Sequence, residues 1–198
     1  MNLFENHNLN LLPYDGEVNY YPNVFTQTEI ENYFNKLLTT MQWQNDEVII
    51  FGKHIITQRK VAWYAANCIS YTYSNTTKLA LPFTKELTNL KLIAEKFAKT
   101  TFNACLLNLY HNGNEGMGWH SDNEKTILPN STIASFSFGA ERKFAFKHKL
   151  SKQNVNIVLQ TGSLLLMSGS TQSHWLHSLP KTKKVNSIRI NLTFRQMV

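Results

Sequence analysis

The sequence predicts a mainly β fold of the jelly-roll type, with flanking helices that place it in the α+β class. From Phe102 onward, short runs of alternating apolar and polar residues are separated by turn signals, such as those at 139–142 and 160–162. Short antiparallel strands at this spacing are typical of a jelly roll, or double-stranded β-helix. Two amphipathic segments in the first half of the chain supply the helices.

The first half of the chain contains the two predicted helices. Residues 26–29, Thr-Gln-Thr-Glu, form a capping box, and apolar residues then follow at helical spacing, so 27–40 is expected to be a helix. The second begins at residues 82–84. Its apolar stripe comprises Leu87, Leu90, Ala94 and Phe97. Residues 1–25 are interrupted by two prolines and are expected to be an irregular arm with strand fragments.

Strand patterns dominate the second half of the chain. The runs with period-2 alternation or β-rich composition are 106–110, 132–138, 143–148, 155–159, 163–168 and 189–195. The glycine-rich segment 112–118 is expected to be a flexible loop that leads into Trp119 and His120.

Length and composition indicate one domain over residues 1–198. The chain is 42% hydrophobic and 12% aromatic, which suffices for a sizeable core. It has no run of about 18 apolar residues, and its start lacks the pattern of a secretory signal, so we expect neither a membrane span nor secretion. The two cysteines, Cys68 and Cys105, are too few for a disulfide framework and are expected to pack in a reducing compartment.

A His-x-Asp pair at His120 and Asp122 is the first candidate for a metal site. Residues i and i+2 of an extended segment point the same way. Two histidines and one carboxylate with open positions form the facial triad of non-haem Fe(II) oxygenases. Such a pair also occurs by chance in surface loops, and either His174 or His177 could supply the second imidazole.

The last predicted strand carries two arginines on its polar face. Arg189, Asn191, Thr193 and Arg195 alternate with Ile188, Ile190, Leu192 and Phe194. If both faces are covered, the arginines need anionic partners. No Asp or Glu follows Glu141, so a bound dicarboxylate such as 2-oxoglutarate would satisfy them. Asn108 and Tyr110 share one side of another strand and could donate to the same ligand, although Tyr110 could instead be a core tyrosine.

The charge balance favours an anionic partner. The net charge is +7 and the isoelectric point about 9.4, which is typical of nucleic-acid binding but also compatible with plain solubility. Some of the lysines form two clusters, one of Lys147, Lys149 and Lys152 and the other of Lys181, Lys183 and Lys184. Each cluster could contact phosphates or be a solvated loop.

In this order, Asn-Leu-Tyr at 108–110, His-x-Asp at 120–122, Ser-Phe-Gly-Ala at 137–140, His-Ser-Leu-Pro at 177–180 and Arg-x-Asn-Leu-Thr-Phe-Arg at 189–195 resemble the AlkB family. That family consists of Fe(II)/2-oxoglutarate dioxygenases that demethylate alkylated nucleobases. The resemblance runs from about Val48 to the C-terminus and is closest to the duplex-DNA repair branch.

The resemblance implies specific roles for these residues. The iron ligands would be His120, Asp122 and His177, which are also the catalytic residues. The residues that hold 2-oxoglutarate would be Asn108, Tyr110, Arg189, Asn191, Thr193 and Arg195. With O2 as the other co-substrate, residues 101–198 would be the catalytic core, and residues 1–100 an N-terminal extension and nucleotide-recognition lid.

Substrate contacts are expected in the lid. Ile50-Phe51-Gly52-Lys53 resembles the finger hairpin that enters duplex DNA, where an apolar wedge fills the gap left by a flipped base. The residues alone favour a core position for Phe51. Tyr71-Thr72-Tyr73 resembles the family's substrate-contacting segment, and its tyrosines suit base stacking or an ordinary aromatic ladder. Arg59 adds charge nearby. Asn123 stands where relatives often carry an acidic residue that touches the base.

The function expected from the sequence is oxidative demethylation of N-alkylated bases in DNA, with release of succinate, CO2 and formaldehyde. We expect a monomer that binds alkylated DNA, cytoplasmic or nucleoid-associated in a prokaryote and nuclear in a eukaryote. The alternatives are an oxygenase acting on RNA, on a protein or on a small molecule, and a non-catalytic binder on a related barrel.

Overall fold

The computed structural model describes residues 9–50, 53–66, 70–73 and 76–198, and they form two sheets that face each other. The larger sheet contains β1 (Glu17–Tyr21), β2 (Gln44–Ile50), β3 (Lys53–Ala65), β6 (Leu81–Pro82), β7 (Ala104–Tyr110), β9 (Ile133–Gly139), β12 (Ser163–Ser168) and β14 (Arg189–Arg195). The smaller sheet contains β8 (Met117–His120), β10 (Arg142–His148), β11 (Asn154–Leu159) and β13 (Trp175–Leu179). A separate hairpin pairs β4 (Ser70–Tyr73) with β5 (Thr76–Leu79).

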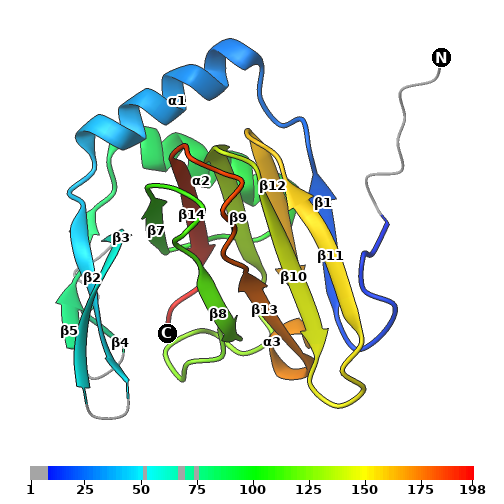
Figure 1. The fold of residues 1–198 in the computed structure, drawn as a ribbon. Coiled ribbons are helices and arrows are strands. Elements are labelled where there is room, and N and C mark those ends of the chain that lie inside the picture. The colour runs from blue at the N-terminus through cyan, green and yellow to red at the C-terminus, as the bar shows by residue number, and fades with distance from the viewer. Residues whose placement is uncertain (1–8, 51–52, 67–69, 74–75) are drawn as a thin grey trace.

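The strand order confirms the jelly roll (Figure 1). It is β1-β12-β9-β14-β7-β3-β2 in the larger sheet, with β6 beside β3, and β11-β10-β13-β8 in the smaller one. All pairs in both sheets are antiparallel except the short β3–β6 contact. The predicted mainly β fold with flanking helices is therefore correct.

The first long helix begins where its capping box predicts, whereas the second begins at Lys85, just after the predicted start at 82–84, because Pro82 belongs to β6. In α1 (Gln27–Thr40), the Thr26 side chain accepts from the Glu29 amide, and the Glu29 carboxylate accepts from the Thr26 amide at 2.8 Å, which satisfies two otherwise unpaired donors. In α2 (Lys85–Ala98), the Thr84 hydroxyl accepts from the Leu87 amide at 3.3 Å, without a return bond from the third helical residue. Phe97 is not part of the buried stripe of α2: it is 37% exposed and packs edge-on against Tyr21.

The two long helices cover the outer face of the larger sheet (Figure 1). Period-2 alternation sends every second side chain of β7, β9 and β14 to that face. The buried side chains there include Leu107, Leu109, Phe136, Phe138, Ile190, Leu192 and Phe194, and Leu37, Leu87, Leu90 and Ala94 of the helices pack against them. Cys105 belongs to the same core, where burial raises the pKa of its thiol; its predicted packing role is confirmed.

The inner face of the larger sheet is divided in two. Towards β1 and β12 it is apolar, where Val18, Ile133 and Leu165 pack with Phe146 and Trp175 of the smaller sheet. Towards β7 and β14 the inward side chains are polar, so a polar interior lies between the sheets at that end. Such a polar interior requires a bound partner or internal ion pairs.

The first 100 residues add strands to both edges of the larger sheet, β1 beside β12 and β2–β3 beside β7. The division into a lid at 1–100 and a core at 101–198 stays a prediction. Among the described helices, none combines the length and apolarity needed to cross a bilayer.

The loop before β8 is tied down rather than free, because a buried arginine binds its backbone. The guanidinium of Arg142, 2% exposed, donates to the carbonyls of Asn112, Gly113, Glu115 and Pro180 at 2.9–3.4 Å. The expectation of a flexible loop at 112–118 is thus corrected: β8 begins at Met117, and the preceding residues are held by β10 and by the chain after β13.

We predict that Arg142→Met destabilises the fold by roughly 3 kcal/mol, because several buried carbonyls lose a charged donor at once. Urea denaturation of the metal-free protein measures this loss. A variant as stable as the wild type would show that water replaces the guanidinium at no cost.

Candidate metal centre and co-substrate pocket

Two histidines and one aspartate meet at the polar end of the interior. His120 ends β8 and pairs in register with His177 of β13, while Asp122 follows β8 two residues later. Asp122 Oδ1 lies 3.6 Å from His120 Nε2 and 3.8 Å from His177 Nε2. One ligand atom from each residue lies within 4.8 Å of the others, which fits the facial triad expected from the sequence.

The second carboxylate oxygen of Asp122 binds an arginine. Arg195 Nη2 donates to Asp122 Oδ2 at 2.6 Å, and both side chains are buried. Burial by itself raises the pKa of Asp122, but the positive charge of Arg195, with further contributions from the imidazoles of His177 and His120, lowers it to about 2. The carboxylate is therefore ionised at neutral pH, with Oδ1 turned to the imidazoles and Oδ2 to the guanidinium.

The imidazole of His177 is kept neutral by its surroundings. It is 4% exposed, stacks on Phe144 at 5.5 Å, and burial lowers its pKa to about 3. A metal ion needs an unprotonated imidazole, so His177 is in the form that coordinates a metal throughout the physiological range. The His120 ring is fixed by a 2.8 Å contact from its Nδ1 to the Gly118 carbonyl, which leaves Nε2 for a metal.

The depressed pKa of His177 predicts acid sensitivity. The unfolded chain protonates this imidazole near pH 6.5, but the folded protein does so only near pH 3. The free energy of unfolding of the metal-free protein should therefore fall as pH drops from about 6.5 towards 3. Asp122 adds to this fall only below its ordinary pKa of 3.8. Urea titrations between pH 7 and 4.5 measure the slope, and His177→Gln should flatten it; an unchanged slope would contradict the assignment.

Buried donors on β14 and β7 fit a dicarboxylate. Arg189 is 2% exposed and donates to Ser137 Oγ at 2.9 Å, but among the described residues it has no carboxylate partner and its Nε has no hydrogen bond. Burial lowers its pKa to about 10, so it is still charged at neutral pH. Asn108 Oδ1 also lacks a partner within the described chain, and rotation of this amide can turn its NH2 to an acceptor. An anionic ligand would satisfy both groups.

The same face shows one departure from the sequence expectation. Both arginines of β14 were expected to need an external acid, because no Asp or Glu follows in the sequence. Arg195 instead finds Asp122, which is 73 residues away in the chain. Asn191 and Thr193 complete this face, with Asn191 donating to Ser135 Oγ at 2.7 Å and Thr193 bonding to Asn191 at 3.3 Å.

Tyr110 lies between two guanidinium groups. Those of Arg189 and Arg59 stand 5.7 Å and 6.0 Å from its ring centroid. Arg59 is not a surface charge: it is 7% exposed, forms a buried ion pair with Asp46 of β2 and donates to Met117 Sδ at 3.3 Å. It therefore connects the edge strands β2 and β3 to the metal centre.

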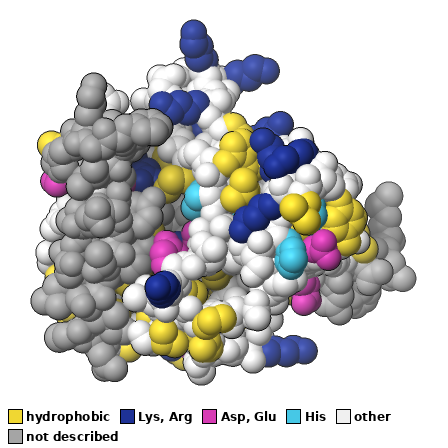
Figure 2. All heavy atoms as spheres, turned by 90° about the horizontal axis from the view of Figure 1, so that it is seen from below, with side chains coloured by type: hydrophobic (Ala, Val, Ile, Leu, Met, Phe, Trp, Pro, Cys, Tyr) yellow, Lys and Arg dark blue, Asp and Glu magenta, His cyan; other side chains and the backbone are white. Residues whose placement is uncertain are grey.

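Two cavities meet at the metal centre. The smaller, about 60 Å³, is lined by the polar face of β14, by Asn108 and Tyr110, and by His177. The larger, about 190 Å³, extends towards β2 and β3 and is lined by Gln42, Gln44, Asp46, Glu47, Arg59, Trp63 and Glu124. Both reach His120 and Asp122. Figure 2 shows histidine, acidic and basic side chains close together in a recess on this side of the molecule.

The structure brings together the predicted metal and co-substrate residues, but not all of the predicted substrate residues can be placed. Phe51 and Gly52 lie outside the described residues, as do the side chains of Lys53, Tyr71, Thr72 and Tyr73. Arg59 lines the larger cavity. Asn123 is not among its lining residues; the neighbouring Ser121 and Glu124 are.

Sequence reasoning missed several residues around the site. Asp46, Glu47 and Trp63 line the larger cavity, and Gln172 accepts from the Asp122 amide at 2.9 Å. The sequence contains one signal of further polar side chains at the site: in β9, Ser135 and Ser137 alternate with Ala134 and Phe136, which indicates that the serines point inward.

The interior between the sheets, with its triad and cationic pocket, has the architecture of an iron- and 2-oxoglutarate-dependent oxygenase, and the comparisons agree. The model of the 2OG-Fe(II) oxygenase superfamily matches residues 17–195. The human DNA oxidative demethylase ALKBH2 is 36% identical over 189 residues, covering 90% of this chain and 72% of that protein. The human alpha-ketoglutarate-dependent dioxygenase alkB homolog 3 is 34% identical over 185 residues, 88% of this chain and 64% of that one.

A solved structure titled "The structure of OsALKBH1" has the same fold. It superposes with a TM-score of 0.62 at 14% identity, over 90% of this chain and 97% of that one. The chain belongs to the AlkB family of 2OG-Fe(II) oxygenases. It is a dioxygenase that uses Fe(II), 2-oxoglutarate and O2.

Proposed function

We propose that this protein removes alkyl groups from N-alkylated bases in DNA by oxidative demethylation. The observation that carries the proposal is the pair of cavities that meet at His120 and Asp122, one lined by cationic and amide donors and the other open towards the lid strands. The relatives named as DNA oxidative demethylases in human and mouse, 36% and 35% identical, support DNA as the substrate.

In this proposal the smaller cavity holds iron and 2-oxoglutarate. His120, Asp122 and His177 are the ligands, and Arg195 holds Asp122 so that one oxygen faces the metal. Arg189 binds the distal carboxylate of 2-oxoglutarate, with Tyr110 packed against its guanidinium. Asn108, Asn191 and Thr193 supply the remaining polar contacts on the same face.

The larger cavity receives the flipped base. Its wall carries the carboxylates of Glu47 and Glu124, which favour a base made cationic by ring alkylation over a neutral one. Trp63 and Val61 line the same cavity and offer apolar contact to the base. The wedge at Phe51 and the base stacking at Tyr71 and Tyr73 stay predictions from the sequence.

The chain positions the groups and excludes water, while the cofactors perform the oxidation. When bound, Fe(II), 2-oxoglutarate and O2 hydroxylate the N-methyl carbon, with succinate and CO2 as co-products; the hydroxymethyl group then leaves as formaldehyde. The acidic wall orients the alkylated ring towards His120 and Asp122. Because His177 is neutral and Asp122 is ionised at neutral pH, neither residue has to lose a proton before it can coordinate the metal.

A panel of methylated oligonucleotides tests the proposal. We expect DNA with 1-methyladenine or 3-methylcytosine, which are cationic, to yield formaldehyde and succinate in equal amounts, and DNA with the neutral 3-methylthymine to react more slowly. The same sequences as RNA and as single and double strands define the preference. Turnover with a methylated peptide, and none with any nucleic acid, would refute the proposal.

The positive net charge agrees with a nucleic-acid partner, but some of the lysines predicted to contact phosphates have partners within the protein. Lys149 Nζ is held by the Gln172 carbonyl at 2.8 Å and by Ser121 Oγ at 3.3 Å, and Lys152 Nζ by the Lys149 carbonyl at 2.6 Å. Lys147 lies over the exposed ring of Trp119 at 4.5 Å. Phosphate contacts from Lys181, Lys183 and Lys184 stay a prediction, as do the monomeric state and a nuclear or nucleoid location.

A further inference from the structure

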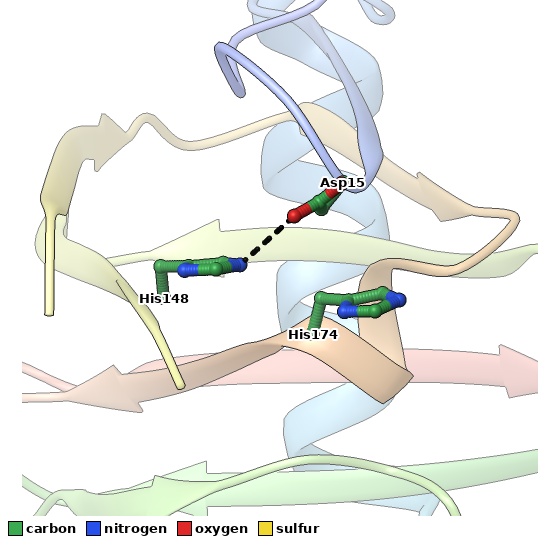
Figure 3. Close-up of side chains that lie close together, drawn as sticks. All are labelled: Asp15, His148 and His174. Atoms are coloured by element: carbon green, nitrogen blue, oxygen red, sulfur yellow. Dashed lines mark ion pairs between the residues drawn. The ribbon is translucent and has the colours of Figure 1, made fainter. Parts of the chain in front are cut away.

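A second cluster of metal-type ligands lies outside the catalytic interior. It combines Asp15, in the turn before β1, with His148 at the end of β10 and His174 at the end of α3 (Thr171–His174). One ligand atom of each lies within 4.8 Å of the other two. Figure 3 shows Asp15 reaching from its turn towards His148, with the ring of His174 beside them. Three segments far apart in sequence thus bring two imidazoles and a carboxylate together.

A buried ring nitrogen of His148 points into this cluster. His148 is 3% exposed, and its Nε2 lies 3.3 Å from Asp15 Oδ2 without forming a hydrogen bond of acceptable geometry to any described residue. A buried polar atom without a hydrogen bond or a metal ion to bind lowers the stability of the fold. A metal ion about 2.0–2.2 Å from both atoms would fit their separation of 3.3 Å.

The His148 ring is held in the orientation that coordination requires. The rings of Tyr14 and Trp175 pack edge-on against it, each at 5.0 Å. Its Nδ1 lies 3.0 Å from Ser151 Oγ, the Ser151 hydroxyl 2.6 Å from Tyr14 Oη, and Tyr14 donates to Gln153 Oε1 at 2.8 Å.

These contacts give a metal-bound His148 a consistent set of donors. With a metal on Nε2, the proton moves to Nδ1 and is donated to Ser151 Oγ; the Ser151 and Tyr14 hydroxyls then donate in turn. Ligating histidines usually have such an outer partner for the second nitrogen. Without metal, Nδ1 instead accepts from the Ser151 amide at 3.0 Å, so metal binding is coupled to a change of the His148 tautomer.

His174 is available as the third ligand. It is half-buried, its ring is nearly parallel to that of His148 at 6.3 Å, and within the described chain its ring nitrogens have no hydrogen bond. The nearest basic side chains in sequence, Lys149 and Lys152, direct their amines to carbonyl and hydroxyl oxygens.

We propose that Asp15, His148 and His174 bind a divalent transition-metal ion such as Zn²⁺, with water in the remaining position. Two imidazoles and one carboxylate suit a borderline metal of this kind. The ion tethers the turn before β1 to β10 and α3. Because α3 also carries Gln172, which holds the Asp122 amide, this structural site supports the segment that delivers Asp122.

Zinc binding by the tag-free protein tests the proposal. His120→Ala removes one ligand of the catalytic triad, so that metal measured in this background reports the second cluster. After dialysis against Zn²⁺, we expect about one ion per chain by elemental analysis. At Zn²⁺ a hundredfold above Kd, we expect a rise in Tm of roughly 5–10 °C.

Matched substitutions in the same background locate the ion. Asp15→Asn and His174→Ala should each weaken Zn²⁺ affinity at least tenfold and abolish the rise in Tm. Glu17→Gln, the same charge change at an exposed position two residues away, should change neither. Circular dichroism without metal checks that each variant is folded. Absence of bound Zn²⁺ in the His120→Ala protein, or unchanged affinity in both Asp15→Asn and His174→Ala, would overturn the proposal.

Discussion

Replacing Asp122 by alanine is expected to abolish 2-oxoglutarate turnover and to destabilise the metal-free protein by about 3–5 kcal/mol. Turnover should be lost because Oδ1 lies close to both imidazoles, where a metal would bind. Replacing a residue that only hydrogen-bonds to a metal ligand can cost roughly 100-fold, and loss of a ligand itself should cost more. The loss of stability follows because Arg195 keeps its charge in the interior but loses its carboxylate.

The two effects can be separated by a second substitution. In Asp122→Ala/Arg195→Met the unpaired charge is gone, so much of the stability should return while turnover stays absent. Iron binding measured by calorimetry and unfolding in urea report the two properties independently. Binding of an alkylated oligonucleotide should survive in the double variant, because the other walls of the larger cavity are intact. An Asp122→Ala protein that binds iron within tenfold of the wild type would show that Asp122 is structural.

The sequence predicted those parts of the site that depend on local geometry. Alternation along residues 189–195 was enough to place Arg189, Asn191, Thr193 and Arg195 on one face, because side chains of a strand alternate regardless of the fold. His120 and Asp122 are neighbours in sequence and remain so in space. The capping box at Thr26 fixed the start of α1 in the same local way.

What the sequence did not predict depends on the pairing of distant strands. Only the family resemblance favours His177 over His174, since nothing local shows that β13 pairs with β8 in the register that joins His177 to His120. The sequence indicates an external acid for Arg195, because its acidic partner Asp122 lies 73 residues away in the chain. Arg59 was interpreted as added charge, although β2 brings Asp46 against it. The meeting of Asp15 with His148 and His174 is of the same kind.

Replacing Arg189 by methionine is expected to weaken 2-oxoglutarate binding at least about thirtyfold, the equivalent of 2 kcal/mol or more, without destabilising the protein. The reason is that Arg189 is buried and charged, yet within the described chain it has only Ser137 as a hydrogen-bond partner. Its charge therefore costs stability until a carboxylate binds, and a methionine of similar length removes that cost.

Arg142→Met is the matched control for this prediction. Both arginines are 2% exposed, but the two Nη groups of Arg142 donate to four backbone carbonyls, so its replacement should lower stability. Calorimetric titration with 2-oxoglutarate and urea unfolding are carried out on both variants. Arg189→Met should lose affinity for 2-oxoglutarate but keep its stability, whereas Arg142→Met should lose stability. If Arg189→Met is destabilised as much as Arg142→Met and still binds 2-oxoglutarate normally, Arg189 is a structural arginine. If Arg189→Met is as stable as the wild type and binds 2-oxoglutarate weakly, the buried guanidinium of Arg189 serves to bind the co-substrate.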